Sequence, residues 1–71
     1  MRIPSTKLKQ LWAENPDKMA HALAESLREF DYNLTDQYVK EQITKLYAGV
    51  EPHGVIAMFL SGWLTEGIGT E

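Results

Sequence analysis

The sequence predicts an all-α protein, a compact four-helix bundle in which a short first helix is followed by three longer ones. Apolar residues recur three and four positions apart in four separate stretches, which is the spacing of one helix face. Helix-starting signals precede three of these stretches, at Asn15-Pro16, Thr35 and Glu51-Pro52. No stretch alternates polar and apolar residues as a half-exposed strand would, so we expect no β-sheet.

The length predicts a single helical domain over residues 1–71. A chain of 71 residues has little room for a second hydrophobic core. Residues 1–4 and 68–71 lie outside the predicted helices, and we expect them to form a flexible arm and a flexible tail.

The composition indicates an ordinary folded protein and argues against several functional classes. With 44% hydrophobic and 24% charged residues, the chain resembles globular rather than disordered proteins. Its formal net charge of −3 disfavours a general affinity for nucleic acid or anionic membranes. The absence of cysteine excludes a disulfide framework and thiolate chemistry. The start resembles no signal peptide, and the longest apolar stretch is shorter than the roughly 20 residues that span a bilayer, so we expect a soluble cytoplasmic protein with no membrane partner.

The first two predicted helices run over 6–13 and 16–31. Ser5 or Thr6 suits the N-cap of the first helix, which is too short to be stable alone and must therefore dock on its neighbours. Its apolar edge consists of Leu8, Leu11 and Trp12. Asn15 suits the N-cap of the second helix, and Pro16 its first position, where no N–H is needed. The apolar stripe of this helix consists of Met19, Ala20, Leu23, Leu27 and Phe30.

The other two helices are predicted over 36–48 and 52–66. Thr35 suits the N-cap of the third helix, and Gly49 suits the left-handed conformation that ends many helices. The core-facing residues of the third helix are Val39, Ile43 and Leu46. In the fourth helix Pro52 takes the first position.

The fourth helix contains the most apolar stretch of the chain, Gly54 to Leu64, which carries no charge. On a helical wheel one side is large and the other mostly small. The large side consists of Val55, Ile56, Phe59, Leu60, Trp63 and Leu64, and the opposite side of Gly54, Ala57, Met58, Ser61, Gly62 and Thr65. Because a helix that is apolar on most sides is usually buried, we predict that this C-terminal helix is central and the most buried.

The small side of this helix predicts a contact with a partner. The first helix spans only about 12 Å, whereas residues 54–65 span about 17 Å, so part of the small side stays uncovered within one chain. The symmetric cover is the same side of a second molecule. We therefore expect a two-fold homodimer with Ala57, Met58 and Ser61 near its axis and Gly62 in the contact. The alternative is that another helix of the same chain packs closely on this side.

The titratable residues predict no catalytic, metal or cofactor site. His21 and Glu25 share a helix face four positions apart, but a third metal ligand is missing. The serines have no histidine and carboxylate partners in a recognisable motif, and no glycine-rich loop suits a phosphate. We expect a protein that is not an enzyme.

Two functional interpretations therefore remain. The first is a non-catalytic helical module that acts through protein–protein contacts, with a homodimer as one form of such contact. The alternative is a helix-turn-helix DNA-binding protein in which helix 36–48 enters the major groove. The DNA-reading residues would then be Gln37, Lys40, Thr44 and Lys45. Against this alternative, helix 36–48 has no arginine, and Asp36 and Glu41 would face phosphates.

Overall fold

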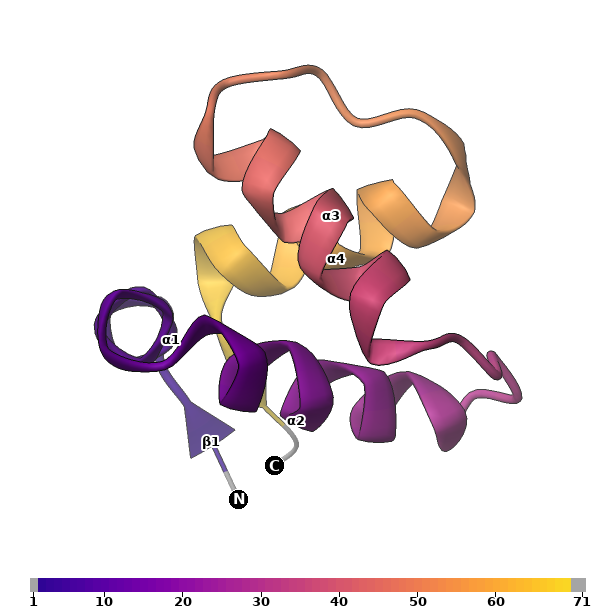
Figure 1. Cartoon of the computed structure of the whole chain (residues 1–71), viewed down its shortest axis with the longest axis horizontal. Helices are drawn as coiled ribbons and strands as arrows, with labels where there is room; N and C mark the ends of the chain where they lie inside the picture. The colour runs from indigo at the N-terminus through magenta and orange to yellow at the C-terminus, as the bar shows by residue number, and fades with distance from the viewer. Residues whose placement is uncertain (1, 70–71) are drawn as a thin grey trace.

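Four helices make up most of the described chain, which is residues 2–69 of a computed structural model. They are α1 (Ser5–Glu14), α2 (Pro16–Arg28), α3 (Asp36–Tyr47) and α4 (Gly54–Glu66). Figure 1 shows α2 running beneath α3 and α4, with α1 at one end of α2. The predicted all-α four-helix bundle is thereby confirmed.

Two of the predicted caps hold their helices as the sequence indicates. The Asn15 side chain accepts a hydrogen bond from the backbone N–H of Lys18 at 3.2 Å, and Pro16 is the first residue of α2. At the start of α3, the Thr35 hydroxyl accepts one from the N–H of Tyr38 at 3.1 Å. Each side chain satisfies one of the N–H groups that a helix start leaves without a partner.

Helix α2 ends three residues before the predicted limit of 31 because its last turn tightens. The N–H of Asp31 bonds to the carbonyl of Arg28 at 3.1 Å, and the N–H of Tyr32 reaches back to Leu27 at 3.2 Å. Asp31 adopts a φ of +69°, in the left-handed region. This is a Schellman ending in which an aspartate occupies the position that glycine usually takes.

Helix α4 begins at Gly54, so the prediction that Pro52 opens it is wrong. Residues 51–53 belong instead to a loop that arches from the end of α3 to the start of α4, as Figure 1 shows. His53, the last residue before α4, has an extended backbone. The chain turns into α4 at Gly54, whose φ of +81° favours glycine.

The two ends of the described chain pair with each other, which corrects the expectation that the chain contains no sheet. Strand β1 (Arg2–Ile3) is antiparallel to β2 (Ile68–Gly69), with Ile3 opposite Ile68. Both isoleucines are partly buried against the core. Strands of two residues are too short to produce an alternating pattern, so they could not be predicted from the sequence. Residues 1, 70 and 71 of the predicted arm and tail lie outside the described residues.

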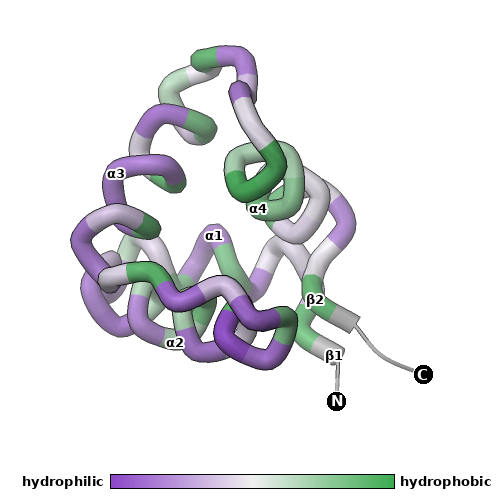
Figure 2. The backbone as a smooth tube through the Cα atoms, turned by 90° about the vertical axis from the view of Figure 1, so that its right-hand side faces the viewer, coloured by the Kyte–Doolittle hydropathy of each residue, from purple (hydrophilic) through white to green (hydrophobic). Residues whose placement is uncertain are grey.

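The core is centred on α2, not on α4 as the sequence predicts. Helix α2 contributes five buried residues, whereas α4 contributes only Ala57 and Leu60. The remaining buried core residues are Leu8 of α1 and Val39 and Ile43 of α3. Figure 2 shows that α4 is nevertheless the most hydrophobic helix. Helix α4 packs mainly on α1 and α3, so part of its apolar surface is left outside the core.

Candidate functional site

The outer side of α4 carries an exposed, uncharged surface. It consists of Val55, Met58, Gly62 and Thr65, which we call the open face of α4. These residues are spaced by three, four and three positions and therefore lie on one side of a helix. Val55 and Met58 are each 64% exposed, and a Cβ added at Gly62 would meet nothing within 4 Å among residues 2–69. Large apolar side chains exposed together are typical of interaction surfaces.

Aromatic rings extend the open face at one edge. Phe30, just beyond the end of α2, is 54% exposed, and its ring centroid lies 5.2 Å from that of Phe59 in α4. The Phe59 ring in turn meets Trp63 edge-on at 4.9 Å. Tilted and edge-on pairs of this kind add about 0.5–1.5 kcal/mol each to the stability of a cluster. The sequence pattern placed Phe30 in the apolar stripe of the second helix and did not predict this exposed position.

The four residues predicted to bind a partner do not share one surface. Met58 and Gly62 are exposed, and Ser61 is half-buried. Ala57 is only 4% exposed and lines a cleft between α3 and the loop before α4, away from the exposed Met58 and Gly62. The helix is rotated about its axis relative to the prediction, which turns Ala57 toward α3. The same rotation turns Val55, predicted for the core side, out to the surface.

Two of the four residues predicted to read DNA already interact with other groups of the chain. Lys40 Nζ lies 2.7 Å from Asp17 Oδ1, so a carboxylate of α2 already neutralises this cation. The Thr44 hydroxyl donates to the backbone carbonyl of Lys40 at 2.8 Å. Gln37 and Lys45 are exposed.

The connection between α2 and α3 also differs from a helix-turn-helix. It occupies residues 29–35, whereas the turn of that motif has about three or four residues. The His21 ring crosses from α2 to α3, with Nδ1 2.9 Å from Asp36 Oδ2. This link joins the two helices through polar side chains on their exposed side, and the spacing of His21 and Asp36 in the sequence does not predict it.

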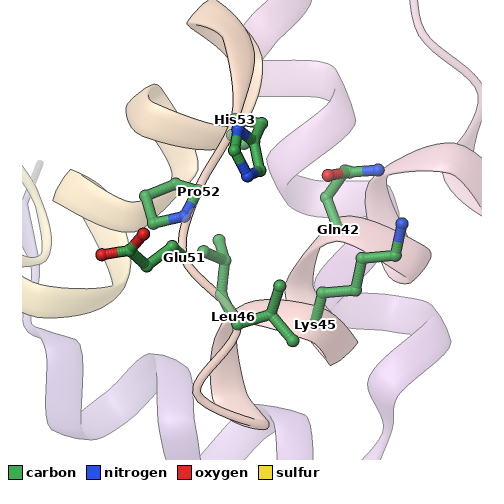
Figure 3. A pocket seen from close by; sticks show the side chains of 8 residues that line it. Gln42, Lys45, Leu46, Glu51, Pro52 and His53 are labelled. Carbon is green, nitrogen blue, oxygen red and sulfur yellow. The ribbon is translucent and has the colours of Figure 1, made fainter.

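A cleft lies between α3 and the loop that precedes α4. Figure 3 shows His53 across the cleft from Gln42 and Lys45, while the Glu51 carboxylate points away from it. The cleft has a volume of about 200 Å³, less than the roughly 300–1,000 Å³ of most small-molecule sites. Its apolar lining residues are Leu46, Val50, Pro52 and Ala57. This hollow is therefore a weaker candidate than the open face of α4.

Within residues 2–69, the hydroxyl of Tyr47 is the one buried side-chain nitrogen or oxygen without a hydrogen-bond partner. Its hydroxyl oxygen is inaccessible to solvent, and its ring lies 5.7 Å from that of Trp12. Burial raises the pKa of the Tyr47 phenol, because the charged phenolate would lose its hydration. The Tyr47 side chain therefore packs between α1 and α3.

No group of three or more metal-ligating side chains occurs within residues 2–69. Nor does any helix in this range have the length and apolar character needed to cross a membrane.

Comparisons of the chain with protein-family models, with curated proteins and with solved structures find no match.

Proposed function

We propose that the chain is a non-catalytic helical module that acts through protein contacts, and that its partner at the open face of α4 is a second copy of itself. The observation that carries this proposal is the exposure of Val55 and Met58 beside Gly62, on a helix with no charge between residues 54 and 65. Fully burying a side chain such as Met58 contributes about 1.5–3 kcal/mol. A two-fold contact uses each such residue twice, once from each copy.

The form of the open face favours a helix as its occupant. Gly62 has no side chain, so the backbone of another helix can approach α4 closely at this point. The neighbouring rings of Phe30 and Phe59 add apolar area to one edge of the contact. Aromatic residues and methionine are enriched at protein interfaces, whereas lysine and aspartate, which the open face lacks, are depleted.

Sedimentation equilibrium at rising protein concentration tests the proposal. We expect a dimer at about 100 μM, well above the micromolar dissociation constants of weak specific complexes. Met58→Lys places a charge in the contact and should give a folded monomer, since the side chain is exposed. Gln10→Lys makes the same change of charge on the exposed side of α1 and should leave the dimer intact.

A monomer for the unmutated chain at about 100 μM would refute self-association. Salt-sensitive binding to a mixed pool of DNA duplexes, weakened by Lys45→Glu, would instead favour the helix-turn-helix alternative. The same sample of protein, measured with and without duplexes, therefore separates the two functions.

A further inference from the structure

The open face of α4 combines a protrusion and a gap. The exposed Met58 side chain projects from the helix, and four residues later Gly62 leaves open space. Four residues correspond to about one helical turn, or 6 Å along the axis. If two copies of α4 pack in parallel about a two-fold axis, Met58 meets the partner's Met58 and the gap at Gly62 meets another gap. If they run antiparallel, each Met58 can fill the gap at the partner's Gly62.

The two ends of α4 carry complementary charge. The first turn of α4 contains no acidic residue, and the His53 side chain at its start makes no capping hydrogen bond within the described chain. The free N–H groups there give this end a partial positive charge. The last turn contains the exposed Glu66 and no basic residue. A carboxylate is unfavourable at the negative end of its own helix and favourable at the start of another.

The Met58 and Gly62 shapes and the charges at the two ends of α4 are consistent with the same two-fold axis. An antiparallel pair that places Met58 opposite the partner's Gly62 has its two-fold axis level with residue 60, midway between them. Residue 66 then lies opposite residue 54, because these two positions are also equally far from residue 60. The register selected by shape therefore brings Glu66 to the start of the partner's α4.

We infer that two copies of the chain dock with their α4 helices antiparallel, each Met58 seated on the partner's Gly62 and each Glu66 at the start of the partner's α4. This arrangement rests on the proposed self-association and adds its orientation and register. Each copy supplies the acidic group that the first turn of the other copy lacks.

Cysteine cross-linking tests the register, because the natural chain contains no cysteine. Met58→Cys and Gly62→Cys proteins are mixed and oxidised, and the products are separated by mass. A disulfide needs Cα atoms within about 7 Å. We expect the mixed disulfide to exceed either symmetric one several-fold, whereas a parallel dimer would favour a disulfide between two Met58→Cys chains.

The role of Glu66 is tested by charge reversal. Glu66→Lys should raise the dissociation constant of the dimer roughly tenfold, since two charge contacts are reversed. Glu41→Lys, an equal change on the exposed side of α3, should leave it within about twofold. A dimer in which symmetric disulfides predominate, or in which both reversals act equally, would overturn the antiparallel register and leave the proposed self-association standing. Absence of any dimer of the unmutated chain would refute both.

Discussion

A Cβ added to Gly67 would lie 2.6 Å from the carbonyl oxygen of Ile3, closer than real contacts allow. Gly67 follows α4 with a φ of +91° and leads the chain into β2 beside β1. Glycine is required here for two separate reasons, the left-handed backbone and the close approach of β1.

The contact with Ile3 predicts that Gly67→Ala is more destabilising than Gly49→Ala. Both glycines have a positive φ, but the space around Gly49 is open. We expect Gly49→Ala to lower the free energy of unfolding by about 1 kcal/mol, and Gly67→Ala by about 2 kcal/mol or more, because its methyl group must displace backbone atoms. Urea denaturation of the two variants measures the difference. Equal losses of the free energy of unfolding would mean that β1 leaves room for a side chain at residue 67.

Gly62→Ala should separate folding from association. In an exposed helix interior, alanine is favoured over glycine by about 0.8–1 kcal/mol, so the isolated monomer should melt at a higher temperature. The added methyl group occupies the gap assigned to the partner's Met58, so dimerisation should weaken. Thermal unfolding at low protein concentration gives the melting temperature of the monomer. Sedimentation at high concentration gives the dissociation constant of the dimer. A variant that associates as tightly as the natural chain would contradict close packing at residue 62.

Asp31→Gly should stabilise the fold. Asp31 adopts a positive φ in the ending of α2, a conformation that is unfavourable for residues with a Cβ. We expect a gain of about 0.5–1 kcal/mol in the free energy of unfolding. Asp31→Ala is the matched control: it removes the same carboxylate but keeps a Cβ, so it should not give this gain. Similar stability of the two variants would show that charge, not backbone conformation, determines the effect.

Tyr47 should make the fold sensitive to alkaline pH. Because burial raises the pKa of its phenol in the folded protein, the unfolded chain releases this proton first, starting near the ordinary value of about 10. The free energy of unfolding is therefore unaffected by this group below about pH 10, and it declines as the pH rises from there toward the folded-state pKa. Tyr47→Phe cannot ionise and should show a smaller loss of stability between about pH 9 and 11. Identical pH profiles would contradict this role.

Tyr47→Phe should also fold at least as stably as the natural chain at neutral pH. The buried hydroxyl has no hydrogen-bond partner among the described residues, so its removal leaves no group unsatisfied. Chemical denaturation at pH 7 measures this second effect separately from the first.

The features of the fold that could be predicted from the sequence are those determined by neighbouring residues. Asn15 and Thr35 cap α2 and α3 as expected, because a capping side chain needs only the backbone N–H groups three residues further on. Gly49 has the left-handed φ of +86° that its place after α3 indicates. Pro52 is a residue that often begins helices, but α4 begins two residues later. The start of α4 depends on the distance that the preceding loop bridges, which neighbouring residues do not reveal.

The candidate site depended on packing between distant segments, so only part of it was predictable. Met58 and Gly62 are exposed residues of the open face, as predicted. Ala57, predicted for the contact, is buried, and Val55, predicted for the core side, is exposed. A helix that is apolar all round offers no polar side to define its orientation, and the helical wheel could not fix the rotation of α4. The pairing of β1 with β2 was equally invisible, because it joins residues from opposite ends of the sequence.

The antiparallel pairing of β1 with β2 also determines how the molecule would respond to mechanical tension. Arg2 pairs with Gly69 at the outer end of this ladder, and Ile3 pairs with Ile68 at the inner end. A force that pulls the two termini apart would load the outer pair before the inner one, so the ladder would unzip one pair at a time instead of shearing as a unit. Helices α1 and α4 would then peel away before tension reached the middle of the chain, which would make the packed pair of α2 and α3 the last part of the core to yield.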